Sequence, residues 1–149
     1  MNILTVDCPD ESSTIKIAEK VAAQLKPGDF IELSGDVGTG KTTFVKGLAA
    51  GLNSKDMVSS PSFALQNVYN GRLKLYHFDL YRLEEPGLVM HEIEESIGDD
   101  KAVVVIEWAG IAKTILPDKR ISVEFSLTGE NSRKLKLSFP DDKNTRGRK

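Results

Sequence analysis

The chain has 149 residues, of which 40% are hydrophobic and 28% are charged, an ordinary composition for a soluble globular protein. No apolar run approaches the roughly 20 residues that a membrane helix needs, which excludes a membrane span. The net charge is −2, and the last nine residues hold four of the 20 basic residues but only two of the 22 acidic ones. The rest of the chain is therefore acidic and poorly suited to a nucleic-acid backbone, so we expect any role with RNA to be indirect.

The two ends of the chain bear on location and domain boundaries. The first residues contain no basic segment followed by an apolar run, so no secretory signal is expected. Cys8 is the single cysteine and cannot form an internal disulfide, and a cytoplasmic location is expected. Residues 141–149 are polar and free of aromatic side chains, which predicts a disordered tail after one domain over residues 1–140.

The first half of the chain predicts a strand, a helix, a second strand and a second helix, over residues 3–6, 10–28, 29–35 and 41–53. The first helix has Asp10, Ser12 or Ser13 as its candidate N-cap, and the Pro-Gly pair at its end stops it. The second strand runs directly into a glycine.

The second half predicts a β-hairpin, a short irregular helix, a fully buried strand and a second hairpin, over residues 62–83, 84–98, 102–108 and 116–140. In the first hairpin, Asn70 and Gly71 predict a type I′ turn, because this pair tolerates the two positive φ angles that the turn requires. The second hairpin is expected to turn at residues 129–131. The alternation of strands and helices predicts an α/β fold, with a parallel core and antiparallel hairpin additions.

The stretch GDVGTGKT, residues 35–42, matches the phosphate-loop pattern GxxxxGK[ST] in full and lies between an expected strand and an expected helix. The glycines let backbone N–H groups surround phosphate oxygens, and the helix N-terminus adds a partial positive charge. Lys41 is expected to reach the β- and γ-phosphates, and the Thr42 hydroxyl is expected to bind Mg²⁺. The expected nucleotide-binding residues of the loop and the first helical turn are Gly35, Asp36, Val37, Gly38, Thr39, Gly40, Lys41, Thr42 and Thr43. These features indicate a P-loop NTPase-like mixed sheet flanked by helices.

Two carboxylates follow apolar strands and are candidates for the second side of the metal site. Asp79 ends the run LKLYHFD, and Glu107 ends the run AVVVIE. The carboxyl ends of strands form the ligand-binding edge of an open α/β sheet, so either residue can hold Mg²⁺ or act on the attacking water. Glu107, Asp79 and Lys41 are therefore the candidate catalytic residues, and the choice of direct metal ligand between the two acids stays open.

Two other side chains near these motifs admit more than one interpretation. His77 alternates within a strand, where a hydrogen-bonded core histidine is favoured over a catalytic one. Trp108 follows Glu107, and core packing is favoured over contact with a base or a partner. Two histidines and one cysteine contain no zinc-binding pattern.

The use of the nucleotide is less constrained by the residues. The chain lacks the Asn-Lys-x-Asp pattern that reads guanine, which favours ATP. A small-molecule kinase is one alternative, with Arg82 holding the acceptor, although no arginine-rich lid segment is present. A nucleotide-dependent switch is another, because the hydroxyls and the proline of residues 59–63 can order against a γ-phosphate.

Several motifs together resemble the TsaE family, the small bacterial ATPases of tRNA threonylcarbamoyladenosine biosynthesis. They are LSGDVGTGKTTFVKGLAAGL, VSSPSF, YHFDLYRL and VIEWAG, in this order, and the resemblance covers roughly residues 8–140. The family usually has Ser-Pro-Thr where this chain has Ser60, Pro61 and Ser62. The segment after Arg82 also departs from the family pattern, although its length is kept.

The resemblance implies a P-loop fold, ATP hydrolysis with Mg²⁺, and work with the TsaB and TsaD proteins. It implies that TsaD performs the transfer to the adenosine beside the tRNA anticodon, so that tRNA is reached through the complex. By position, Thr42, Asp79 and Glu107 match the family's metal and hydrolysis residues, and residues 60–63 match its switch-like segment. Arg133, in the last hairpin, matches a family position near the nucleotide.

Overall fold

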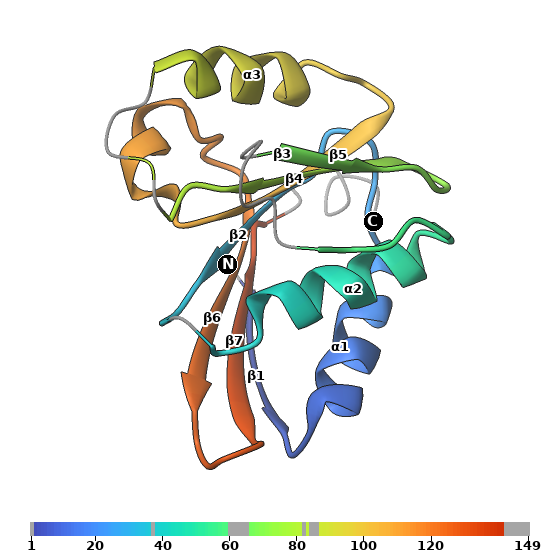
Figure 1. Ribbon diagram of the computed structural model, residues 1–149, viewed down its shortest axis with the longest axis vertical. Coiled ribbons are helices and arrows are strands. Elements are labelled where there is room, and N and C mark those ends of the chain that lie inside the picture. The colour runs from blue at the N-terminus through green and yellow to red at the C-terminus, as the bar shows by residue number, and fades with distance from the viewer. Residues whose placement is uncertain (1, 37, 60–65, 82, 84–86, 142–149) are drawn as a thin grey trace.

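The computed structural model describes residues 2–36, 38–59, 66–81, 83 and 87–141 (Figure 1). The elements, in chain order, are β1 (Asn2–Cys8), α1 (Glu11–Ala23), β2 (Phe30–Ser34), α2 (Lys41–Gly51), β3 (Gln66–Tyr69), β4 (Lys74–Asp79), α3 (Gly87–Ile97), β5 (Ala102–Glu107), the short 3₁₀ helix η1 (Ala109–Ile115), β6 (Ile121–Leu127) and β7 (Arg133–Phe139). None of the described helices is long and apolar enough to cross a membrane. The helix η1 was not predicted from the sequence.

The seven strands form one mixed sheet in the order β1-β7-β6-β2-β5-β4-β3. The central strands are parallel, because β2 pairs with both β5 and β6 and β4 pairs with β5 in that sense. The hairpin pairs β3 with β4 and β6 with β7 are antiparallel, as is the pairing of β1 with β7. The expected α/β architecture, with a parallel core and antiparallel additions, is confirmed.

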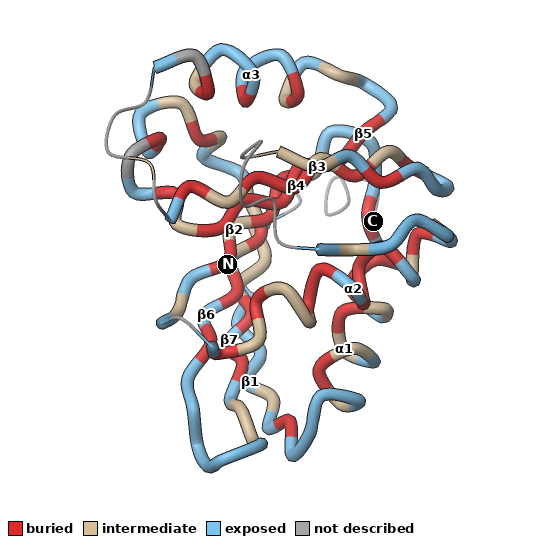
Figure 2. The backbone as a smooth tube through the Cα atoms, viewed as in Figure 1, coloured by how far each residue is buried: buried red, intermediate tan, exposed pale blue. Residues whose placement is uncertain are grey.

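Apolar side chains cover both faces of the sheet. Strand alternation sends Val103 and Val105 of β5 into a cluster with α1 and α2, and sends Val104 and Ile106 into a second cluster with α3 and η1. Figure 1 shows the two helical layers on opposite sides of the sheet, and Figure 2 shows the continuous buried stretch through its middle. All six residues of β5 are buried, as the uninterrupted apolar run predicts.

Local signals account for the start of the first helix. Asp10 is the N-cap of α1, and its carboxylate accepts hydrogen bonds from the backbone N–H and the hydroxyl of Ser13, each at 2.8 Å. Of the three candidate caps in the sequence, the structure therefore selects the first. A short aspartate at this position satisfies N–H groups that the first helical turn leaves without a partner.

The first hairpin is confirmed, but its predicted type I′ turn is wrong. Neither Asn70 nor Gly71 has a positive φ, and four residues rather than two separate β3 from β4. The reason is a tertiary contact, because a Cβ on Gly71 would lie 2.3 Å from the carbonyl oxygen of Leu52. That oxygen also accepts a hydrogen bond from the backbone N–H of Arg72 at 2.6 Å. The glycine thus permits close approach to the end of α2 rather than a left-handed turn.

The remaining predictions differ mainly at their boundaries. The second hairpin turns between Leu127 and Arg133, which are paired residues, so the expected turn at residues 129–131 is confirmed. The helix expected over residues 84–98 is α3, which begins at Gly87, while residues 84–86 lie outside the described part of the chain. The predicted tail also lies outside it, apart from Asp141.

Candidate functional site

Residues 35–40 connect the carboxyl end of β2 to the start of α2 at Lys41, the context that the phosphate-loop motif requires. Gly40 is the N-cap of α2, with a φ of +100°, a backbone conformation that favours glycine. It supplies no side-chain hydrogen bond to the helix. The N–H groups of the first turn therefore have no side-chain cap, and an anion at this helix end would accept from them.

The loop has its own internal hydrogen bonds. The Thr39 side chain is buried, and its hydroxyl donates to the carbonyl oxygen of Asp36 at 2.7 Å. The backbone N–H of Thr39 donates to the same oxygen at 3.3 Å. Val37, also expected to contact nucleotide, lies outside the described residues. The described part of the loop is thus a folded turn rather than an open segment.

Lys41 projects back over this loop. Its Nζ donates to the carbonyl oxygens of Gly35, at 2.5 Å, and Asp36, at 3.0 Å, and lies 4.3 Å from the centre of the Trp108 ring. The residue is only 6% exposed. Burial lowers the pKa of Lys41, and the nearby Glu107, Asp79 and Asp36 carboxylates oppose that shift. A buried cation held by loop carbonyls can exchange those partners for phosphate oxygens.

The two predicted carboxylates lie side by side at the same edge of the sheet. Asp79 and Glu107 are register partners at the carboxyl ends of β4 and β5, and Glu107 is also paired with Leu33 of β2, two residues before the loop. Glu107 is only 3% exposed. One oxygen of Asp79 accepts from the backbone N–H of Tyr81 at 3.1 Å. Both acids therefore face the region that Lys41 and the start of α2 enclose.

The two threonines at the start of α2 differ in their contacts. The Thr43 hydroxyl points to α1, where it donates to a Glu11 carboxylate oxygen at 3.4 Å. Its expected contact with phosphate remains a prediction. Thr42, the second residue of α2, is half-buried beside the loop.

Arg133, the first residue of β7, lies against the phosphate loop. Its guanidinium donates to the backbone carbonyl oxygens of Thr39 at 3.0 Å and Gly38 at 3.3 Å. Arg133 thereby places a second positive charge beside the loop and links it to the last hairpin. Nothing local in the sequence points to this contact, since the resemblance to a family was its only signal.

His77 belongs to the site through a contact that sequence reasoning missed. The residue is fully buried and hydrogen-bonded, as expected of a core histidine. Its partner is a candidate catalytic residue, because Nε2 lies 2.6 Å from an oxygen of Glu107. On the other side of the ring, Nδ1 lies 3.1 Å from the hydroxyl of Tyr69. The sequence did contain one signal that His77 lies near the site. His77 is two residues from Asp79 within one strand, which places both side chains on one face of the sheet.

Trp108 is half-buried, and its backbone adopts the left-handed conformation, with a φ of +59°. Its ring packs on Tyr81 with a centroid distance of 4.8 Å and also lies over Lys41. It packs on the edge of the cluster with α3 and η1, so the favoured interpretation of core packing describes part of its surroundings. The rest of its described surroundings is the ammonium of Lys41.

The donor set suits a hard divalent cation such as Mg²⁺, which prefers oxygen ligands and keeps several waters and phosphate oxygens. Thr42, Asp79 and Glu107 offer such oxygens. Among the described residues, no three His, Cys, Asp or Glu side chains are grouped closely enough to hold a metal by themselves. The protein ligands would therefore complete a metal shell made largely by nucleotide and water.

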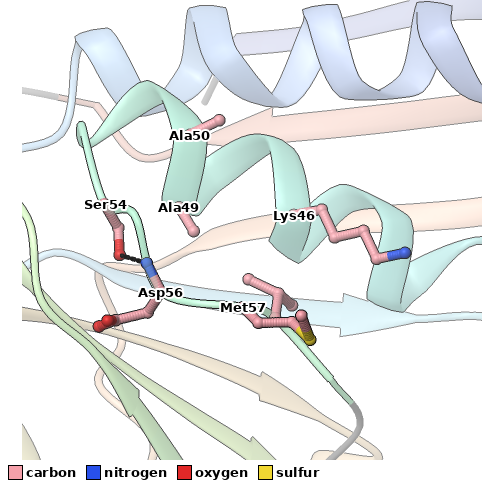
Figure 3. A pocket seen from close by; sticks show the side chains of 7 residues that line it. Lys46, Ala49, Ala50, Ser54, Asp56 and Met57 are labelled. Atoms are coloured by element: carbon pink, nitrogen blue, oxygen red, sulfur yellow. Dashed lines mark hydrogen bonds between the residues drawn. The ribbon is translucent and has the colours of Figure 1, made fainter.

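Other predicted features lie outside this region or outside the described residues. A shallow cavity of about 370 Å³ lies along α2 and the segment after it, lined by residues that include Lys46, Asp56 and Met57 (Figure 3). It contains none of the predicted site residues. The switch-like residues 60–63 and Arg82 fall outside the described part of the chain.

The chain is similar to known proteins in family, sequence and structure. Residues 8–135 match the family described as "Threonylcarbamoyl adenosine biosynthesis protein TsaE". The tRNA threonylcarbamoyladenosine biosynthesis protein TsaE of Bacillus subtilis (strain 168) is 38% identical over 133 residues, which are 85% of this chain and 78% of that protein. The protein of the same name from Aquifex aeolicus (strain VF5) is 38% identical over 130 residues, which are 85% and 90% of the two chains. A crystal structure of Bacillus subtilis YdiB superimposes with a TM-score of 0.80 and 32% identity, covering 97% of this chain and 90% of that one.

Proposed function

Because the chain belongs to the TsaE family of threonylcarbamoyl adenosine biosynthesis proteins, we propose that it is a Mg²⁺-dependent ATPase that supports threonylcarbamoyl modification of tRNA. The observation that carries this proposal is the meeting of three groups at one sheet edge. The uncapped start of α2, the buried Lys41 and the paired acids Asp79 and Glu107 all lie there. Phosphate, metal and water each have a suitable partner in this arrangement.

The residues divide the work by their chemistry. The loop N–H groups and Lys41 would bind the phosphates, and the Thr42 hydroxyl with one or both acids would hold Mg²⁺. The metal supplies positive charge that offsets the charge of the phosphates during transfer. Glu107, anchored by His77, would orient the attacking water, and Arg133 would hold the loop in its binding conformation. Lys41 and Arg133 already contact the loop, and Glu107 already contacts His77.

The role in tRNA modification would be exercised with partners. We place the protein in the cytoplasm, beside the TsaB and TsaD proteins, with TsaD performing the transfer of the threonylcarbamoyl group. The acidic charge of the chain supports this arrangement, because a surface poor in basic residues binds RNA phosphates weakly. Contact with tRNA would then run through the complex. The relatives named above favour this role over that of a small-molecule kinase.

The test is ATP hydrolysis by the purified chain, alone and with TsaB plus TsaD, with Mg²⁺ and after its removal by a chelator. Lys41→Ala is expected to abolish tight ATP binding, because it removes the ammonium that would bind the phosphates. Glu107→Gln is expected to bind ATP within a few-fold of the unaltered chain but to lose on the order of 100-fold or more in hydrolysis, as loss of a group acting on the reacting water does.

Glu130→Gln is the matched control, because this glutamate is exposed in the loop between β6 and β7. Equal loss of binding and hydrolysis in Glu107→Gln would refute the proposed division of roles. Transfer of the γ-phosphate to a small metabolite, with no effect of the partner proteins, would instead establish a kinase.

A further inference from the structure

A chain of hydrogen bonds leads from Glu107 away from the nucleotide site. It passes through His77, by the Nε2 contact of 2.6 Å, and then from Nδ1 to the Tyr69 hydroxyl at 3.1 Å. The Tyr69 hydroxyl in turn lies 3.0 Å from the backbone carbonyl oxygen of Ser59. The four residues come from β5, β4, β3 and the segment before β3, so this series of hydrogen bonds crosses three neighbouring strands.

Sheet register explains how these side chains meet. His77 is the partner of Val105, which is two residues from Glu107, and Tyr69 is the partner of Leu75, two residues from His77. Residues two apart in a strand share a face, so all three polar side chains project from the face that α1 and α2 cover. They are diagonal neighbours, a spacing that long side chains can bridge.

Burial makes these contacts obligatory. Tyr69 is 3% exposed, His77 is fully buried and Glu107 is 3% exposed, so none can replace a lost partner with bulk water. Across the described residues, no buried side-chain nitrogen or oxygen lacks a hydrogen-bond partner. Loss of the bond to Glu107 would therefore leave the His77 Nε2 unsatisfied, whereas the Tyr69 hydroxyl and the Ser59 carbonyl also contact the side-chain amide of Asn67, at 3.4 Å and 3.1 Å.

The donors and acceptors also assign an order. An ionised Glu107 can only accept, so the His77 Nε2 donates to it, and a neutral ring then presents Nδ1 as an acceptor to the Tyr69 hydroxyl. That hydroxyl has one proton and two acceptors at nearly equal distances, His77 and the Ser59 carbonyl. The Tyr69 oxygen itself lies 3.4 Å from the backbone N–H of Ser59. A movement of His77 thus changes how Tyr69 holds the Ser59 backbone.

We propose that His77 and Tyr69 are positioning residues that fix the Glu107 carboxylate for its role in hydrolysis and couple it to the backbone of Ser59. The inference rests on the proposed function, because it takes Glu107 as the residue that acts on the reacting water. His77 supplies the orientation, since a short bond to a charged oxygen restricts the rotation of the carboxylate. Tyr69 supplies the link to the segment that precedes β3.

The first experiment separates the two nitrogens of the His77 ring. In His77→Gln the side-chain amide can take the place of Nε2 and still donate to Glu107, whereas in His77→Asn it reaches only as far as Nδ1. We expect His77→Asn to lower kcat for ATP on the order of 10-fold to 100-fold, the usual cost of losing a group that orients a site ligand. Its affinity for a non-hydrolysable ATP analogue should stay within about two-fold. His77→Gln should recover part of the lost kcat.

His91→Asn is the matched control, because His91 is exposed on α3 and pairs only with Glu95 among its described contacts. It should leave kcat and affinity unchanged. Thermal melting identifies a variant that fails to fold, in which case the comparison of His77→Gln with the unaltered chain still decides the question. A kcat of His77→Asn equal to that of the unaltered chain would overturn the positioning role. Equal losses of kcat in the Asn and Gln variants would also overturn it.

The second experiment needs no hydrolysis. Tyr69→Phe keeps the ring but removes the hydroxyl that Ser59 contacts, so amide exchange at Ser59 should become several-fold faster. Glu107→Gln should also change the exchange at Ser59, although the two residues are on different segments. Unchanged exchange in Glu107→Gln would refute the coupling. If the unaltered chain hydrolyses no ATP, alone or with its partners, the proposed function fails, and the exchange result still tests the link from Glu107 to Ser59.

Discussion

Lys41 illustrates how one residue can favour ligand binding while lowering the stability of the protein without ligand. Its ammonium is buried, and the described groups that compensate for lost water are loop carbonyls, an aromatic ring and nearby carboxylates. Burial lowers its pKa despite those carboxylates, so the surrounding protein groups by themselves disfavour the charge overall. A phosphate group would supply the missing negative charge. The residue is thus placed for a ligand rather than for the stability of the fold.

This placement predicts a pH dependence. In the folded chain the pKa of Lys41 lies below its ordinary value of 10.5. At pH values between these two, Lys41 binds more protons in the unfolded chain than in the folded chain. The free energy of unfolding contributed by this group therefore rises as pH rises through that window. We expect the unaltered chain to gain stability relative to Lys41→Met as pH rises toward 10.5, measured by urea unfolding at each pH.

The matched control for this prediction is Lys46→Met, which removes an exposed lysine of the same helix. It should follow the unaltered chain over the whole range. A constant difference between Lys41→Met and the unaltered chain at all pH values would contradict the assignment of the effect to Lys41.

The candidate site was predictable where its signals are local. The phosphate-loop motif identified Lys41, and the ends of two apolar strands identified Asp79 and Glu107, which the structure brings together as register partners. The contact of His77 with Glu107 spans 30 residues, and that of Arg133 with Thr39 spans 94. The two-residue offset of His77 from Asp79 indicates that they share a face of one strand, but no spacing in the sequence shows which residue of another strand they meet, because that depends on which strands become neighbours.

At the scale of elements, the packing of α1 against α2 sets the platform for the phosphate loop. A Cβ on Gly47 would lie 2.5 Å from the Cβ of Ala18 and 2.6 Å from the carbonyl oxygen of Ile15. These distances are shorter than any normal contact, so the helices would have to separate to admit a methyl group. The small residue thus allows the two helices to approach closely.

Gly47→Ala is therefore expected to lower the free energy of unfolding by about 1–3 kcal/mol, the usual cost of overpacking, even though alanine is the better helix former. Urea unfolding measures the change. Gly110→Ala is the control, because a Cβ there meets nothing within 4 Å, and its effect should be small. A stability of Gly47→Ala equal to or above that of the unaltered chain would show that the helices separate at no cost.

The first hairpin shows that the sequence predicts strands better than it predicts the turn between them. Two apolar runs around Asn70 and Gly71 indicated the strands correctly, but the pair does not form the turn that its residue types favour. The contacts of Gly71 and Arg72 with the end of α2 decide the turn, and Asn70 donates from its backbone N–H to Asp56 at 2.7 Å. Tertiary hydrogen bonds outweigh a local conformational preference here.

For the whole molecule, charge predicts the mode of contact with RNA. The net charge is −2, and the last nine residues are net basic, with four of the 20 basic and two of the 22 acidic residues, so the rest of the chain is more acidic than the whole. Neutralisation of phosphates by Lys and Arg is the source of non-specific affinity, so we expect the isolated chain to bind tRNA with a Kd weaker than about 100 μM at physiological salt. An electrophoretic mobility shift measures this affinity. Retention of tRNA only after TsaB and TsaD are added is the expected result.

Tight binding of tRNA by the isolated chain would contradict this view of an indirect role. A variant that ends at residue 140 then distinguishes the basic tail from the body of the protein. Loss of binding in that variant would assign the affinity to the tail, and retention would assign it to a surface of the folded domain.

The sequence by itself determined the class of fold, the phosphate loop, the two strand-end acids and the family, because each depends on a short pattern or on residues near one another in the chain. The tertiary structure alone decided which strands are neighbours, and with that the pairing of Asp79 with Glu107, the contacts of His77 and Arg133, and the form of the first turn. The physical reason is the range of the forces involved. Helix and strand preferences act within a few residues, whereas burial obliges polar groups from distant segments to find one another, and only the folded chain shows which ones meet.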